Sequence, residues 1–99
     1  MPIIFTSAFP VQNAGDWDGI WIYEGLSNTC VFDNCLITYG GGYSYGGNIT
    51  LRHDVGNMVS ISNCEISNSK EFGIYKKEVN APTLINNTFI NNAKGDKNW

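Results

Sequence analysis

The sequence has no long apolar run and little positive charge. No stretch approaches the roughly 18 apolar residues of a membrane-spanning helix, so no membrane insertion is expected. The opening, residues 1–5, lacks the charged start and apolar core of a secretory signal peptide. Lys and Arg together number 6 in 99 residues, the net charge is −3, and no basic stripe forms. Nucleic acid, which needs a basic footprint, is therefore not an expected partner.

Metal-binding motifs and helical patterns are also missing. The three cysteines Cys30, Cys35 and Cys64 show no CxxC or Cys/His spacing, which argues against a zinc site. We expect reduced, buried thiols that pack as small hydrophobes, with a disulfide as the alternative. No stretch has the apolar periodicity of an amphipathic helix.

What the sequence does contain is a repeat. Each copy is a short alternating strand, an Asn and a second alternating strand: CVFDNCLI at 30–37, VSISNCEI at 59–66 and TLINNTFI at 83–90. Apolar residues at every second position predict strands. Repetition at this spacing is typical of a solenoid, in which successive turns of the chain stack on one another.

The repeats align on Asn34, Asn63 and Asn87, which are 29 and 24 positions apart. Asn tolerates the left-handed backbone conformation that a sharp corner between two strands needs. Because stacked parallel strands lie about 4.8 Å apart, we expect the corner side chains to bond to one another as an asparagine ladder.

The same alignment assigns side chains to the inside and the outside of the solenoid. The expected interior columns are Phe32/Ile61/Ile85, Cys35/Cys64/Thr88 and Ile37/Ile66/Ile90. The side chains expected to point outward are those of Val31, Leu36, Leu84 and Phe89, with Ser60 and Glu65 between them. Exposed apolar columns often mark contacts, so either this face or an open end of the stack pairs with another copy, or loops cover these side chains.

One domain is expected over residues 1–99, because a chain of this length rarely holds two. The coils are predicted at roughly 2–42, 43–72 and 73–93, followed by a tail at 94–99. Further strands are predicted at 3–7, 19–22 and 73–75, while 48–52 is either a strand or part of a loop. An open-ended stack of so few coils points to a homo-oligomer or to part of a longer chain.

The Asn-corner repeats resemble the right-handed parallel β-helix family, which has a pectate-lyase-like architecture. The segments PIIFTSA (2–8), GDWDGI (15–20) and LITYGG (36–41) are similar to a subgroup found in large bacterial surface and secreted proteins. Asp18 stands where that subgroup often has a second Gly. The resemblance covers residues 2 to 93. It implies an all-β fold, a short right-handed parallel β-helix of about three to four coils.

The resemblance implies an extracellular or cell-surface location but no single activity. The family includes lyases, hydrolases, epimerases, adhesins and chains without a known ligand. Its pectate-lyase-type members pair an Arg or Lys base with Ca²⁺-binding acids on one outer face, and its polygalacturonase-type members gather Asp on adjacent coils. Neither set can be matched here, since Asp33 is followed in its outer column by Ser62 and Asn86. No catalytic residue is therefore predicted.

Two short segments are candidates for ligand binding. Asp16, Trp17 and Asp18 form either a sugar platform, whose carboxylates accept hydroxyl bonds or hold a Ca²⁺ ion, or an Asp-capped turn with Trp17 packed over the first coil. In the Gly-rich loop at 39–47, Tyr43 and Tyr45 either stack on sugar rings or belong to a loop that folds over an open end.

A third polar segment is Arg52-His53-Asp54, which holds the only Arg and the only His. His beside a carboxylate is a candidate general base. Neighbouring residues of a strand point to opposite faces, however, so an ion pair between Arg52 and Asp54 is the simpler interpretation.

These observations favour a non-catalytic β-helix module that binds a polysaccharide or a partner surface, or acts as a scaffold. A fragment of a polysaccharide lyase or glycoside hydrolase is the alternative. No cofactor is expected beyond the Ca²⁺ considered at Asp16 and Asp18.

Overall fold

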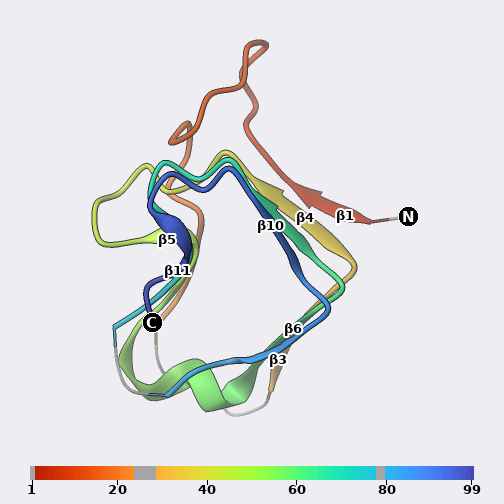
Figure 1. Ribbon diagram of the computed structural model, residues 1–99, viewed down its shortest axis with the longest axis vertical. Helices are drawn as coiled ribbons and strands as arrows, with labels where there is room; N and C mark the ends of the chain where they lie inside the picture. Colours follow the sequence, from red (N-terminus) through yellow and green to blue (C-terminus); the bar gives the residue numbers. More distant parts are fainter. Residues whose placement is uncertain (1, 24–28, 78–79) are drawn as a thin grey trace.

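The computed structural model describes residues 2–23, 29–77 and 80–99, with the side chains of 54–56 left out. The chain winds through successive three-sided coils that overlie one another when viewed down the shortest axis of the molecule (Figure 1). Its strands, in chain order, are β1 (Ile3–Phe5), β2 (Ile20–Ile22), β3 (Cys30–Asp33), β4 (Cys35–Thr38), β5 (Gly47–Leu51), β6 (Val59–Ser62), β7 (Glu65–Ser67), β8 (Phe72–Lys76), β9 (Thr83–Ile85), β10 (Thr88–Ile90) and β11 (Gly95–Lys97). A short 3-10 helix, His53–Met58, precedes β6.

Three parallel sheets form the sides of the coils. Their strand orders are β1-β4-β7-β10, β2-β5-β8-β11 and β3-β6-β9. Consecutive strands of the chain therefore fall in different sheets, and each sheet receives a new strand once per coil. Every pair of neighbouring strands is parallel, as a solenoid of stacked turns requires. The predicted parallel β-helix is thus confirmed.

The first and second coils stack in the predicted register. Phe32 pairs with Ile61, and Ile37 pairs with Ile66. These residues belong to a core in which Ile37, Ile61 and Ile66 have no exposed surface. The segment at 48–52 supplies most of β5, and Ile49 and Leu51 add to the same core. Like side chains therefore fill shared interior columns through most of the stack.

The third coil is one residue out of the predicted register. Ile61 pairs with Leu84 and not with Ile85, and Ile66 pairs with Phe89 and not with Ile90. Leu84 and Phe89 pack against the core, whereas Ile85 and Ile90 are 51% and 41% exposed. The prediction for the interior of this coil was therefore wrong, as was the outward assignment of Leu84 and Phe89.

The pair Asn86-Asn87 explains this shift. The left-handed corner is Asn86, with a φ of 56°, and Asn87 takes the interior position that Cys64 holds in the second coil, where Thr88 was expected. There the Asn87 side chain accepts a hydrogen bond from the Cys64 N–H at 3.0 Å and donates one to the Ile61 carbonyl at 2.9 Å. These two bonds satisfy backbone groups at the corner of the coil beneath.

The first two corners form as predicted and the third lies at Asn86 instead of Asn87, but no asparagine ladder is seen among the described residues. Asn34 and Asn63 have φ values of 57° and 54°, which places both in the left-handed region. Asn63 donates to the Asp33 carboxylate at 3.0 Å. No hydrogen bond in the described parts of the chain joins two corner Asn side chains, so side chain-to-Asp and side chain-to-backbone bonds hold the corners instead.

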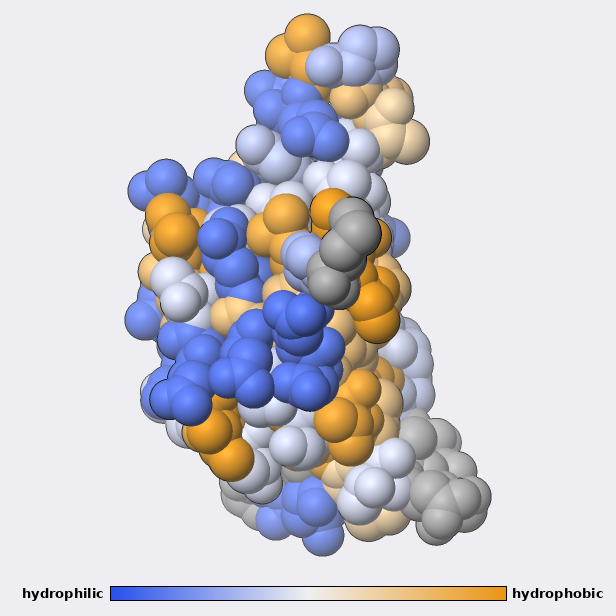
Figure 2. All heavy atoms as spheres, turned by 90° about the vertical axis from the view of Figure 1, so that its right-hand side faces the viewer, coloured by the Kyte–Doolittle hydropathy of each residue, from blue (hydrophilic) through white to orange (hydrophobic). Residues whose placement is uncertain are grey.

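The ends and faces of the stack complete the fold. Residues 95–97, expected to lie in a tail, form β11 and pair with β8. The three cysteines are free thiols. On the side of the molecule that carries β10, β4 and β1, apolar side chains are interspersed with hydrophilic ones (Figure 2). None of the helices in the described ranges is both long and apolar enough to cross a membrane.

Candidate functional site

Strand β2 sorts its side chains between the core and the outer surface. Ile20 and Ile22 pack against the core, so the alternation of a strand turns Trp21 and Tyr23 outward. The next coil places Arg52 beside Tyr23, because Ile22 pairs with Leu51 and the Arg52 N–H donates to the Ile22 carbonyl at 2.8 Å. Two neighbouring coils therefore bring aromatic rings and a guanidinium to one outer face.

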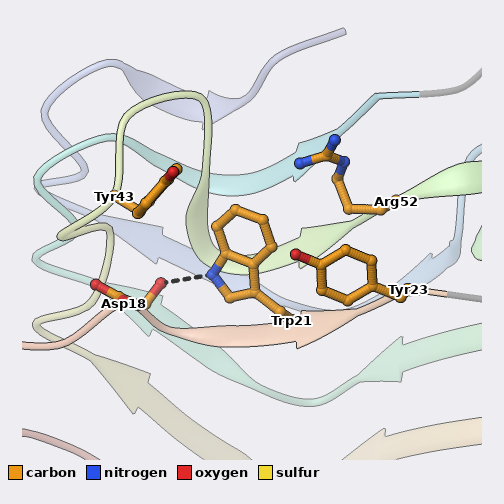
Figure 3. Close-up of a pocket in the computed structure, with 5 residues that line it drawn as sticks. All are labelled: Asp18, Trp21, Tyr23, Tyr43 and Arg52. Atoms are coloured by element: carbon orange, nitrogen blue, oxygen red, sulfur yellow. Dashed lines mark hydrogen bonds between the residues drawn. The ribbon is translucent and has the colours of Figure 1, made fainter.

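The Gly-rich loop lies against this same face. The Gly42 N–H donates to the Trp17 carbonyl at 2.9 Å, and the Gly47 N–H donates to the Thr50 hydroxyl at 3.0 Å. Gly46 has no room for a Cβ without crowding Thr50 and the Trp21 ring. The close packing seats the loop beside β2 and β5, and it brings Tyr43 next to Trp21 (Figure 3).

The result is a cleft of about 350 Å³, which we call the aromatic cleft (Figure 3). Its lining residues are Asp18, Trp21, Tyr23, Tyr43 and Arg52. The Trp21 and Tyr43 rings meet edge to face, with centroids 5.5 Å apart and planes at 90°. Tyr23 stacks near Trp21 at 5.9 Å and 28°. The Trp21 indole N–H donates to the Asp18 carbonyl at 3.0 Å, which fixes the ring.

Arg52 closes one end of the aromatic cleft. Its guanidinium carbon lies 5.7 Å from the Trp21 ring centroid and 5.8 Å from that of Tyr23. These are cation–π distances, and they hold the planar group in one orientation. The Nε atom is buried and has no hydrogen-bond partner.

A second cavity of about 390 Å³ continues from the first and is called the adjoining cleft. It shares Tyr43 and Arg52 with the aromatic cleft. Its other lining residues are Ser44, Tyr45, Tyr75 and Lys77. The two cavities together form one extended surface across three neighbouring coils.

The structure separates the five predicted ligand residues into two groups. Asp18 and Tyr43 line the aromatic cleft, and Tyr45 lines the adjoining cleft. Asp16 instead accepts hydrogen bonds from the Ser7 hydroxyl at 2.6 Å and the Asn13 N–H at 2.8 Å. Trp17 packs against the core and donates to the Thr38 carbonyl at 2.9 Å.

The arrangement around Asp16 also bears on Ca²⁺. Asp16 caps a turn, and both of these hydrogen bonds reach the same carboxylate oxygen, Oδ2. Within the described ranges, no three or more His, Cys, Asp or Glu side chains gather in a metal-binding group. Asp16 and Trp17 therefore fit the capped-turn alternative, and the cleft takes only Asp18 from this segment.

Sequence reasoning missed Trp21 and Tyr23, and it assigned Arg52 to an ion pair with Asp54 and not to a ligand site. A usable signal was present in Ile20-Trp21-Ile22-Tyr23, where two Ile alternate with two aromatic residues. If the Ile side chains fill the core, both rings must point out on the same face. The position of Arg52 was harder to infer, because it depends on the register between β2 and β5. The side chain of Asp54, its expected partner, lies outside the described residues.

A third cavity lies on another sheet, between β4, β7 and the segment that follows β1. Its volume is about 340 Å³, and Thr38, Glu65, Ser67 and Asn68 are among its lining residues. Ser67 hydrogen-bonds with both Thr38 and Glu65, and Asn68 donates to Thr38. Since these polar groups already satisfy one another, the aromatic cleft is the stronger candidate for ligand binding.

Comparison with known proteins bears on the fold. A family model described as a right handed beta helix region matches residues 11–96, which is most of the chain and includes every residue of both clefts. No curated protein and no solved structure matches the chain.

Proposed function

The chain belongs to the right-handed β-helix family, and on this premise we propose that it is a non-catalytic module that binds carbohydrate through the aromatic cleft. The stacked coils act as a rigid support, and the outer face of β2 and β5 carries the binding residues. A polysaccharide at a cell surface or outside the cell, the setting that the family resemblance implies, is the proposed partner.

The observation that carries this proposal is the combination of groups in one cleft. Trp21, Tyr23 and Tyr43 offer broad aromatic surfaces, which suit the apolar C–H faces of sugar rings. Asp18 lies at one end and Arg52 at the other, with Trp21 between them (Figure 3). Sugar hydroxyls both donate and accept, so a carboxylate and a guanidinium at opposite ends can fix the orientation of a ring.

Rigid positioning supports the same proposal. Trp21 lies within β2, and Tyr23 and Arg52 directly follow β2 and β5, two strands hydrogen-bonded in register. Trp21 is held further by its bond to the Asp18 carbonyl. Side chains that are fixed before binding lose little conformational entropy when a ligand arrives.

The number of carboxylates favours binding over hydrolysis. Glycoside hydrolysis commonly uses two carboxyl groups on either side of the scissile bond. Among the described residues, the aromatic cleft has one carboxylate, Asp18, and the adjoining cleft has none. A fragment of a lyase or hydrolase would need further acids at this surface.

The proposal is tested by binding of soluble oligosaccharides, followed by tryptophan fluorescence and titration calorimetry. The decisive variant is Trp21→Ala, and the matched control is Trp99→Ala. Trp99 is 40% exposed and stacks near Lys97, outside both clefts. Loss of a stacking ring should weaken binding by about tenfold or more, while the control should bind normally. Absence of binding across neutral, carboxylated and sulfated oligosaccharides, or equal weakening by both variants, would contradict the proposal.

A further inference from the structure

We propose that the ligand carries an anionic group, as in a carboxylated or sulfated glycan, and that Arg52 and Lys77 together recognise that group. This inference rests on the proposed carbohydrate-binding function and adds the chemical class of the ligand.

The first argument is the unpaired state of Arg52. Its guanidinium contacts Trp21 and Tyr23, and none of the described residues forms an ion pair with it. The ion pair recorded in the described ranges joins Lys94 to Glu71. A guanidinium in this state has a fixed fork of donors, which matches carboxylate, sulfate or phosphate oxygens.

The second argument is the position of Lys77. Leu51 pairs with Lys76 across β5 and β8, so Arg52 and Lys77 are neighbours one position further along. The Lys77 N–H donates to the Leu51 carbonyl at 3.0 Å, which extends the register to this point. Two cationic residues are therefore adjacent on neighbouring coils, where like charges repel. An anion bound between them would relieve that repulsion.

The third argument concerns a cationic ligand, which the aromatic walls alone would also suit. Aromatic rings beside an acid resemble the cages that bind quaternary ammonium groups. In this cleft, however, the protein's own Arg52 already lies over the Trp21 and Tyr23 rings. A second cation would meet its positive charge, so the electrostatics favour an anion.

The two clefts also suggest how a longer ligand would lie. Arg52 and Tyr43 line both cavities, while Lys77 lines the adjoining cleft and Asp18 the far end of the aromatic cleft. A sugar ring over Trp21 would direct hydroxyl groups toward Asp18. Its anionic group, or that of the next ring, would lie between Arg52 and Lys77. Since each cavity exceeds 300 Å³, the surface fits an oligomer better than a single small ion.

The test compares an oligouronate with the same oligomer after its carboxylates have been reduced to alcohols. A sulfated oligosaccharide of similar length is the third probe. In titration calorimetry, at least one of the two charged probes, the oligouronate or the sulfated oligosaccharide, should bind at least about tenfold more tightly than the reduced oligomer. Raising the salt concentration from 50 to 500 mM, chosen to shorten the screening length from about 14 to about 4 Å, should narrow this difference.

Arg52→Gln and Lys77→Gln should each lower affinity for the charged oligomers more than affinity for the reduced oligomer, and so remove most of the preference for the anion. The matched control is Lys70→Gln, which removes one positive charge at an exposed residue outside both clefts. Lys77→Gln should unfold at the wild-type urea concentration. Arg52→Gln loses its contacts with the Trp21 and Tyr23 rings and should unfold at a slightly lower one.

The outcomes separate this inference from the proposed function. Equal affinity for charged and reduced oligomers, abolished by Trp21→Ala, would overturn the anionic specificity and leave carbohydrate binding in place. If Arg52→Gln and Lys70→Gln lose the preference for the charged oligomer to the same extent, the assignment of Arg52 as an anion-binding residue is wrong. No binding of any probe would overturn the inference together with the proposed function.

Discussion

The Gly40 N–H donates a hydrogen bond of 2.7 Å to the side-chain oxygen of Asn48, which is wholly buried. The amide nitrogen of Asn48 donates to the carbonyls of Ile37 and Ser67, at 3.1 and 2.8 Å. One side chain thus joins the first coil to the second at a corner. A buried polar side chain of this kind holds the fold together through satisfied bonds rather than through apolar contact.

Asn48→Ala should therefore lower the free energy of unfolding by about 2–4 kcal/mol, because three buried backbone groups lose a partner. The matched control is Asn92→Ala in the third coil. Asn92 bridges the Ser69 N–H and the Ile66 carbonyl in the same way, but it is only half-buried. Water can replace its bonds, so a loss of about 1 kcal/mol is expected. Urea unfolding measures the free energy of unfolding of both variants. If it falls by the same amount in both, burial does not explain the contribution of Asn48 to stability.

The register of the third coil gives a second prediction. Leu84 packs against the core, whereas the adjacent Ile85 is 51% exposed. Leu84→Ala should lower the free energy of unfolding by about 1–2 kcal/mol, less than at a fully buried site. Ile85→Ala should change it by less than about 0.5 kcal/mol. The opposite order in urea unfolding would show that Ile85 faces the interior.

This coil also shows which parts of the structure could be predicted from the sequence and which could not. The repeat and its alternation predicted the solenoid, the strands and the pairing of Phe32 with Ile61. Alternation alone does not fix which of two apolar sets faces inward when both are apolar, as in residues 83–90. The choice depends on the corner at Asn86 and on the hydrogen bonds of Asn87, which are tertiary contacts.

The candidate site was predictable to a similar degree. Asp18 and Tyr43 could be selected because acids and aromatic residues in loops are typical of sugar-binding surfaces. Their meeting with Trp21 could not be derived, since the loop that carries Tyr43 is placed by a bond from the Gly42 N–H to the carbonyl of Trp17, far away in the sequence. Residue type is local information, but the assembly of a cleft depends on the path of the backbone in three dimensions.

The buried thiol of Cys35 predicts a loss of stability in alkaline solution. Burial, followed by the neighbouring Cys64, raises the pKa of Cys35 above its ordinary value. The folded protein therefore keeps a proton that the unfolded chain releases above about pH 8.5. The stabilisation from this group is complete below that pH and declines as the pH rises toward the folded pKa.

The free energy of unfolding, measured between pH 7 and 10, should thus fall less steeply in Cys35→Ala than in the wild type. In the native protein a thiol reagent should modify Cys30, which is half-buried, before Cys35 and Cys64. Identical pH slopes in variant and wild type, or equally fast modification of all three thiols, would contradict this account.

Gly19 gives a prediction that links the fold to the cleft. It has a φ of 91°, and a Cβ at this position would collide with the Gly47 carbonyl oxygen. Gly19→Ala should therefore lower the free energy of unfolding by about 3 kcal/mol or more. Gly95→Ala is the control, since Gly95 has a φ of 118° but open space around its Cβ position. Conformational strain alone should cost about 1 kcal/mol there.

Because Gly19 precedes β2, its substitution should also displace Trp21. Near-ultraviolet circular dichroism, which reports the fixed environment of aromatic rings, should change in Gly19→Ala and not in Gly95→Ala. If the two variants were equally stable, the space between Gly19 and the Gly47 carbonyl oxygen would have to be wider than it is in the structure.

The two loop tyrosines should contribute unequally to ligand binding. Tyr43 lines both clefts and meets the Trp21 ring edge to face, whereas Tyr45 lines only the adjoining cleft and is 76% exposed. Tyr43→Ala removes a ligand contact and a support of Trp21, so affinity should fall by about tenfold or more. Tyr45→Ala should reduce affinity by less than about threefold, because an exposed ring loses side-chain entropy on binding. Titration calorimetry on the best oligosaccharide probe measures both variants. A larger loss in Tyr45→Ala would place the main ligand contacts in the adjoining cleft instead of over Trp21.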